Sequence, residues 1–301
     1  MGESSGVANR SLRADTVGAL VKAMAAILDD AFGDTARREA QELLAALHDM
    51  PRHWPTVEQA QRISTEEWLR AIRAAKRRAR GAPLQYAAGR ASFRHLTLDV
   101  DERVLIPRPE TEQLVDLVLD ALRGELAGIV VDVGTGSGAI ALAIASEGNA
   151  SLVIGTDVSV DALAVAHANV ARHAGVLRAT VELRAGSLLG PVHERGLRAV
   201  VSNPPYISWG DRDALPAGVR DWEPAVALFS DGDGMAVTAR LVRDAAAALA
   251  PSGLLALEVD ARRASTAAEL VGSNGAYEMV QVVLDLTGRE RFVVARRRGS
   301  E

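Results

Sequence analysis

The chain has 301 residues, of which 48% are hydrophobic and 24% charged, with no cysteine and a formal net charge of −5. These values are typical of a soluble globular protein long enough for two domains. The lack of cysteine excludes disulfides, zinc–thiolate sites and thiol catalysis, and the negative charge argues against a general nucleic-acid binder. No apolar run approaches the roughly 20 residues that cross a bilayer, and the first ten residues lack a signal-peptide pattern. We therefore expect a cytoplasmic protein that is not bound to a membrane.

The first part of the chain predicts a small helical domain. Residues 1–10 are expected to form a disordered tail, and from 11 to 81 apolar residues recur at helical spacing. Ser64 and Glu67 have the spacing of a capping box that opens the last helix. The basic run 73–80 is typical of the solvated C-terminal end of a helix, where cations complement the helix dipole, and less so of a contact with an RNA-rich or acidic partner. We expect four or five helices.

A linker and a hairpin are expected next, over residues 82–109. Apolar residues alternate between Ser92 and Leu105, which predicts a β-hairpin. An extended loop at 106–109 then leads into a helix from Glu110 to Leu122.

The remainder, residues 110–301, alternates between strand and helix patterns. Strands are predicted at 129–133, 152–156, 181–183, 197–202 and 254–259, and helices at 139–146, 160–173 and 235–250. Two last strands, 277–284 and 291–295, are close enough in sequence to pair antiparallel. The alternation predicts an α/β domain with a parallel sheet and helices on both faces.

A glycine-rich loop follows the first of these strands. Gly134, Gly136 and Gly138 stand at the strand-to-helix turn, where backbone amides can approach a ligand and the next helix presents its N-terminal N–H groups. Asp157 ends the following strand, where a carboxylate can accept both hydroxyls of a ribose. Dinucleotide sites prefer G-x-G-x-x-G. Here the third glycine comes one residue early, which favours S-adenosylmethionine over NAD.

The tetrapeptide Asn203-Pro204-Pro205-Tyr206 follows the fourth predicted strand. The Asn203 side-chain carbonyl and the Pro204 backbone carbonyl can each accept a hydrogen bond from a planar NH₂ group. Pro205 holds Pro204 in an extended conformation, and the Tyr206 ring can lie against the planar group. Asn-Pro and Pro-Pro also occur in ordinary turns. Placement after a strand, downstream of the glycine loop, favours methyl transfer from S-adenosylmethionine to a planar nitrogen.

The motifs together resemble the PrmC/HemK family, the peptide chain release factor glutamine N5-methyltransferases. The resemblance covers nearly the whole chain beyond residue 10. It is carried by the following stretches: Pro83–Tyr86 with Gly89, Val104–Glu112, Asp132–Gly138, Asn203–Tyr206 and Asp285–Arg291. The Asn-Pro-Pro-Tyr motif alone is shared with adenine DNA methyltransferases, but its combination with Ile-Pro-Arg-Pro-Glu-Thr-Glu at 106–112 is far more specific.

The resemblance implies a seven-stranded, Rossmann-like class I methyltransferase domain and a helical domain that docks the release factor. It implies N5 methylation of the glutamine in a Gly-Gly-Gln loop, with Asn203 and Pro204 as catalytic groups that hold the amide and with Pro205 and Tyr206 beside them. It implies these cofactor contacts: Gly134, Thr135, Gly136, Ser137, Gly138, Asp157, Leu188 and Asn203. No metal and no direct nucleic-acid substrate are expected.

Two positions depart from the family pattern. Ser187 stands where an acidic residue is frequent, so an adenine-side hydrogen bond is weaker here or comes from the serine. Val259-Asp260 replaces Ile-Gly after Glu258.

Three other functions are open to such a chain. The first is glutamine methylation of a ribosomal protein, against which the stretch Pro83–Tyr86 weighs. The second is adenine-N6 methylation of DNA or RNA, which requires base flipping and a positive binding face. The third is a binding module without catalysis, which the intact Asn203 and glycine loop oppose.

Overall fold

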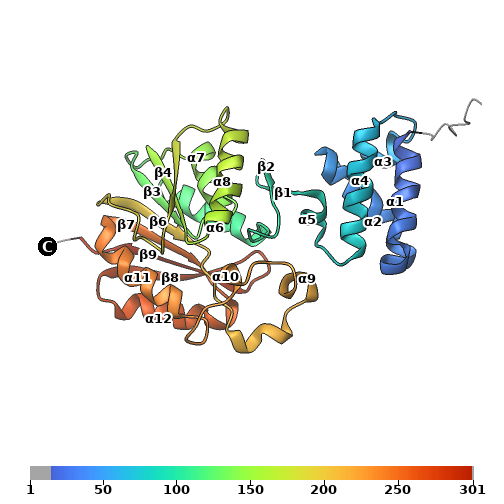
Figure 1. The fold of residues 1–301 in the computed structure, drawn as a ribbon. Coiled ribbons are helices and arrows are strands. Elements are labelled where there is room, and N and C mark those ends of the chain that lie inside the picture. Colours follow the sequence, from blue (N-terminus) through green and yellow to red (C-terminus); the bar gives the residue numbers. More distant parts are fainter. Residues whose placement is uncertain (1–14, 300–301) are drawn as a thin grey trace, which may run out of the picture. The chain divides into compact units, whose positions relative to one another are not determined.

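The computed structural model describes residues 15–299 (Figure 1). The expected disordered tail at 1–10 and the first residues of the expected helical domain lie outside this range. The chain divides into two units, one ending at Ala88 and the other beginning at Gly89. No helix within residues 15–299 is both long and apolar enough to cross a membrane.

The first unit consists of helices around an aliphatic core. They are α1 (Val17–Phe32), α2 (Ala36–His48), α3 (Trp54–Val57), α4 (Thr65–Ala79) and α5 (Leu84–Ala88), with a 3₁₀ turn η1 (Gly33–Thr35). Leu20, Met24 and Leu28 of α1 lie one helical turn apart and are fully buried against Leu43 and Leu44 of α2. The stretch after Gly81, expected as linker, contains α5, which packs on α2 and α4. The helical unit therefore extends to Ala88.

The fourth helix begins and ends as its sequence predicts. The Ser64 hydroxyl accepts from the Glu67 N–H at 3.2 Å, and the Glu67 carboxylate accepts from the Ser64 N–H at 2.7 Å, which forms the capping box. The Ser64 hydroxyl also donates to the Glu67 carboxylate at 2.8 Å. The two hydrogen bonds that this carboxylate accepts, from the Ser64 N–H and the Ser64 hydroxyl, hold the pKa of Glu67 below its usual value. In the basic run, Arg78 pairs with Glu39 at 2.6 Å and lies over the Phe32 ring.

Removing this cap tests the stability of the helical unit. Replacing Ser64 with alanine should lower its free energy of unfolding by about 1 kcal/mol, because the Glu67 N–H loses its acceptor. Hydrogen exchange of the buried amides of α1 and α4 measures the change. Ser64→Asp, which keeps a capping oxygen, should restore most of the protection. Equal protection in wild type and Ser64→Ala would show that the cap adds nothing.

The second unit begins with a short hairpin. Strands β1 (Arg90–Phe93) and β2 (Leu96–Asp99) pair antiparallel, and α6 (Pro109–Ala121) follows. The expectation of a hairpin continuing to Leu105 is wrong. The Val104 N–H bonds to Asp101 in a turn, and this turn buries the Val104 side chain without a further strand.

A seven-stranded sheet forms the rest of the unit. The strands are β3 (Ile129–Val133), β4 (Leu152–Asp157), β5 (Thr180–Ala185), β6 (Leu197–Ser202), β7 (Leu249–Glu258), β8 (Tyr277–Leu284) and β9 (Glu290–Arg297). Their order is β5-β4-β3-β6-β7-β9-β8, and β9 alone runs in the direction opposite to the other six strands. The predicted parallel sheet with a terminal antiparallel pair is confirmed, and the structure supplies the longer bounds of β5 and β7.

Helices cover both faces of this sheet (Figure 1). One face carries α6, α7 (Ala139–Glu147) and α8 (Val160–His173), and the other carries α11 (Ala236–Ala248) and α12 (Ala264–Ser273). Between β6 and α11 the chain forms three short helical turns: η2 (Trp209–Ala214), α9 (Ala217–Arg220) and α10 (Ala225–Leu228). The sequence patterns predicted no elements in this stretch, which forms part of the wall described next.

Candidate active site

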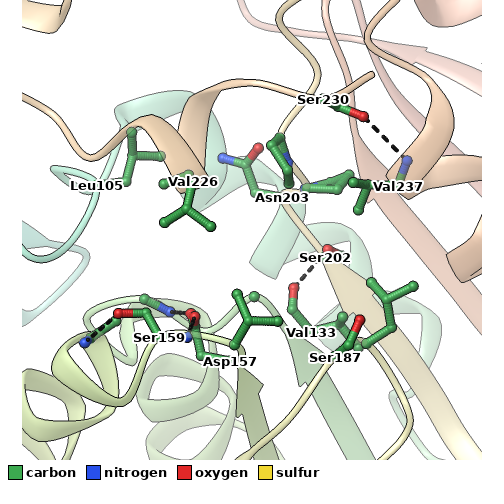
Figure 2. Close-up of a pocket in the computed structure, with 18 of the residues that line it drawn as sticks. Leu105, Val133, Asp157, Ser159, Ser187, Ser202, Asn203, Val226, Ser230 and Val237 are labelled. Carbon is green, nitrogen blue, oxygen red and sulfur yellow. Dashed lines mark hydrogen bonds between the residues drawn. The ribbon is translucent and has the colours of Figure 1, made fainter. Parts of the chain in front are cut away.

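A cavity of about 680 Å³ opens at the carboxyl ends of β3, β4 and β6 (Figure 2). The strand order reverses between β3 and β6, and open parallel sheets bind ligands at this switch point. The volume falls within the roughly 300–1,000 Å³ usual for small-molecule sites. Seven residues expected at the site line it: Gly134, Gly136, Asp157, Leu188, Asn203, Pro204 and Pro205. The other four do not: Thr135, Ser137, Gly138 and Tyr206.

The glycine loop exposes its backbone to this cavity. Gly134 and Gly136 have φ angles of 74° and 54°, and a Cβ at either position would meet nothing within 4 Å. Both positions therefore keep a left-handed backbone that glycine adopts without strain, with free space above it. Gly138, at φ 85°, is the N-cap of α7.

Asp132 stabilises the conformation of the glycine loop from beneath. Asp132 is fully buried, and its carboxylate accepts from the Thr135 hydroxyl at 2.6 Å and from the Ala141 N–H at 3.1 Å. Burial raises the pKa of Asp132 to about 7, although these two hydrogen bonds act in the opposite direction. Thr135 is thus turned inward, which explains why it does not line the cavity.

Asn169 is a second internal support that the sequence reasoning missed. This fully buried residue of α8 donates to the Ser137 carbonyl at 2.9 Å, and its side-chain oxygen accepts from the Asp99 N–H at 2.7 Å. It therefore joins the glycine loop to the end of the hairpin. The one sequence signal for Asn169 is its position on the face of α8 that packs inward.

Asp157 is fixed on one wall of the cavity by two backbone groups. Its Oδ2 accepts from the Gly136 N–H and its Oδ1 from the Ser159 N–H, both at 2.9 Å. The carboxylate cannot swing away without breaking one of these hydrogen bonds. Its remaining lone pairs are available to a ligand.

Leu188 also lines the cavity. Its backbone has φ 52°, and its carbonyl accepts from the Thr156 hydroxyl at 2.8 Å. Ser187, the first departure from the family pattern, is exposed and lines the cavity. The second departure includes Asp260. This residue caps the 3₁₀ turn η3 (Ala261–Arg263) by accepting from the Arg262 N–H.

Asn203 lies on the wall opposite Asp157 (Figure 2). The Asn203 Nδ2 donates to the Thr111 hydroxyl at 3.3 Å, and that hydroxyl donates to the Glu258 carboxylate at 2.7 Å. No other hydrogen bond involves the Asn203 side chain among the described residues, so its Oδ1 is available as an acceptor. Thr111 and Glu258 belong to α6 and the end of β7, and the sequence reasoning gave them no role.

Tyr206 is half-buried and does not line the cavity. Burial raises the pKa of its phenol, and the nearby Glu258 adds to this effect. A Cβ at Gly234 would overlap the Tyr206 carbonyl, so the chain after β6 is packed closely at this point.

The stretch after Tyr206 closes the wall around Asn203. Trp209 stacks on Phe229 with ring centroids 4.4 Å apart, and both line the cavity. Val226, half exposed, stands beside Asn203 (Figure 2). The site thus has a polar wall at Asp157 and an apolar, aromatic wall around one amide. Within residues 15–299 no cluster of three or more histidine or carboxylate side chains could hold a metal ion.

The comparisons with known proteins agree with this architecture. The family model described as PrmC N-terminal domain matches residues 19–89, and the methyltransferase small domain model matches residues 111–215. The chain is 43% identical over 212 residues to a release factor glutamine methyltransferase of Gloeobacter violaceus, which covers 70% of this chain and 73% of that protein. A protein of the same name from Lactococcus lactis is 30% identical over 91% of this chain and 97% of its own.

Among solved structures, the catalytic domain of hMettl16, determined with the MAT2A 3′UTR hairpin 6, superposes with a TM-score of 0.53. The two are 14% identical, and the match covers 79% of this chain and 83% of that one. At this identity the likeness shows a common fold.

Proposed function

The chain belongs to the release factor glutamine methyltransferase family, and from this premise we propose that it methylates the N5 amide of the glutamine in the Gly-Gly-Gln motif of peptide chain release factors. The methyl donor in this proposal is S-adenosylmethionine. The single observation that carries it is that Asp157 and Asn203 face one cavity from opposite walls. A cofactor held by the first and an amide held by the second would meet there. Because release factors act on the ribosome, we infer a cytoplasmic location.

The residues around Asp157 fit S-adenosylmethionine. Gly134 and Gly136 leave open space above a bare backbone, and Asp157 presents a fixed carboxylate to the ribose hydroxyls. Leu188 offers an apolar side chain for the adenine. Thr135, Ser137 and Gly138 would contribute through the loop backbone, since their side chains or Cα atoms lie behind the lining. When bound, the cofactor supplies a methyl group on a positively charged sulfur, which leaves without protonation.

The residues around Asn203 fit a primary amide. Its Oδ1 would accept one amide hydrogen and the Pro204 carbonyl the other, which aims the nitrogen lone pair into the cavity. Both acceptors bond more strongly as the nitrogen gains positive charge, so they stabilise the transition state over the ground state. The nitrogen loses one proton on methylation. Carbonyl oxygens are weak bases, and we infer that this proton passes to water.

The acceptor class can be tested directly. We expect tritium from labelled S-adenosylmethionine to enter a release factor with an intact Gly-Gly-Gln loop. A release factor with that glutamine changed to asparagine, a ribosomal protein fraction and adenine-containing DNA serve as separate acceptors. Label in the ribosomal fraction or in DNA, with none in the release factor, would contradict the proposal and favour one of the other acceptors.

The helical unit is the proposed recognition element for the protein substrate. Every residue that lines the cavity comes after Gly89 in the chain. A shortened chain beginning at Gly89 should bind S-adenosylmethionine within about threefold of the full chain, yet methylate an intact release factor roughly tenfold less efficiently or worse. Calorimetry and kcat/KM measure the two effects.

A short Gly-Gly-Gln peptide provides the control for this prediction. The peptide is too small to need a separate docking surface, so both chains should methylate it at similar rates. Equal kcat/KM of the two chains on the intact release factor would show that the helical unit does not recognise it.

A further inference from the structure

Behind Asn203 lies a buried polar pair that no part of the proposed mechanism yet uses. Thr111, in the first turn of α6, is 5% exposed, and Glu258, the last residue of β7, is 1% exposed. Their side chains are 2.7 Å apart and Thr111 is 3.3 Å from the amide nitrogen of Asn203. Three separate elements thus converge on one chain of hydrogen bonds. A carboxyl group is costly to bury without a strong partner, so this arrangement calls for an explanation.

The Thr111 hydroxyl determines which groups donate and which accept along this series of hydrogen bonds. A threonine hydroxyl has one hydrogen to donate, and a carboxylate can only accept. When Glu258 is ionised, the Thr111 hydrogen is committed to it, and the Thr111 oxygen is left as an acceptor. Only the NH₂ end of Asn203 can satisfy that acceptor. The Oδ1 end is then the one left for a substrate amide.

We propose that Thr111 and Glu258 are positioning residues that fix the side-chain amide of Asn203 with its oxygen toward the substrate. This inference rests on the proposed glutamine methylation. Without the pair the Asn203 amide could rotate by half a turn about its last bond and present NH₂ hydrogens, which repel those of the incoming amide. The pair therefore sets which end of Asn203 the substrate meets.

Protonation of Glu258 can reverse the donor and acceptor roles in the hydrogen bonds that join Glu258, Thr111 and Asn203. Burial raises its pKa to about 7, and Glu110 acts in the same sense, whereas Thr111, Arg291 and Arg108 lower it. Tyr206 also lies within its electrostatic reach. A protonated Glu258 can donate to Thr111, whose hydrogen then turns to Asn203 and selects the amide oxygen. The productive orientation should thus be present above the pKa and be lost as the pH falls through it.

The test uses the full chain with Thr111→Val, which keeps the shape of the side chain and removes the hydroxyl. Single-turnover methylation at saturating cofactor and acceptor should fall about tenfold, the order expected for one lost buried hydrogen bond. Thr111→Ser should recover most of the rate. Thr238→Val is the matched control, because Thr238 is also fully buried and its hydroxyl has no partner among the described residues. Cofactor affinity should stay close to wild type in all three, whereas the melting temperature of Thr111→Val should fall, because the buried Glu258 loses the hydroxyl that donates to it.

The pH profile is the readout that a merely structural role would not change. The wild-type single-turnover rate should rise with pH to a plateau above about pH 7. Glu258→Gln cannot ionise and should lose this step, as should Thr111→Val, while Thr238→Val keeps it. A wild-type rate and profile in Thr111→Val would overturn the inference.

A measurement without acceptor separates this inference from the proposed function. The side-chain NH₂ signals of Asn203, assigned by their loss in Asn203→Asp, should shift with pH near Glu258 ionisation in wild type and stay constant in Glu258→Gln. If wild type fails to methylate any glutamine but this shift is seen, the proposed function fails and the positioning pair stands. If these signals do not change with pH in wild type, the positioning role of Thr111 and Glu258 is refuted, even in an active enzyme.

Discussion

Replacing Asn203 with alanine should lower kcat on a Gly-Gly-Gln release factor by about 10²–10³, which corresponds to roughly 2.7–4 kcal/mol of transition-state stabilisation. That is the usual effect of removing one preorganised dipole at a reacting centre. The loss should be in kcat more than in KM, because the amide hydrogens bond most strongly once the nitrogen carries positive charge. Single-turnover methylation by the full chain measures it. Asn149→Ala is the matched control, since Asn149 is exposed and does not line the cavity.

Asn203→Asp is the sharper version of this experiment. Aspartate suits a turn as well as asparagine does, so a purely structural role would leave it active. The carboxylate, however, has no hydrogen for the Thr111 oxygen and would bring a second negative charge close to Glu258. We expect its rate to be as low as that of Asn203→Ala. Near-wild-type methylation by both variants would mean that the tetrapeptide only shapes the chain.

The second large effect concerns the opposite wall. Asp157→Ala should weaken S-adenosylmethionine binding about ten- to a hundredfold, because hydrogen bonds to a charged group are worth roughly 1.5–3 kcal/mol. Part of this loss is indirect, since the same carboxylate accepts from the Gly136 N–H and so holds the glycine loop. Calorimetry on the folded variant gives the affinity directly.

Two further variants separate a general effect of negative charge near the site from the direct hydrogen bonds of Asp157. Asp161→Ala removes an exposed carboxylate from the first turn of α8, outside the cavity lining, and should bind as wild type does. Asp157→Asn keeps one acceptor and should fall between wild type and Asp157→Ala. Unchanged affinity in Asp157→Ala would refute the assignment of this residue to the ribose.

The central strands of the sheet could be predicted closely because they are buried on both sides. Ile129–Val133 and Leu197–Ser202 are mostly apolar, each with one charged residue, and such runs identify central parallel strands. The glycine spacing and the position of Asp157 at a strand end depend on neighbours in sequence alone. The sequence by itself therefore predicted the parallel sheet, the loop and seven residues that line one cavity.

The turn-rich stretches were less predictable because their structure depends on distant partners. Residues 209–228 form three short helical turns that carry few apolar repeats of their own, and they are held by contacts such as the bridge between Ile207 and Phe229. The hairpin ends at Asp99 because the chain turns back at Asp101, which no alternation pattern reveals.

Only the tertiary structure decided how the predicted residues are held. The Asn203 amide bonds to a hydroxyl 92 residues away, and that hydroxyl bonds to a carboxyl 147 residues from it. Thr135 and Tyr206 stand inside recognisable motifs yet do not line the cavity. Thr135 donates to the buried Asp132, and Tyr206 is half-buried outside the lining. A motif specifies which residues arrive at a strand end. Burial and the need to satisfy every buried hydrogen-bonding group then determine which way each side chain points.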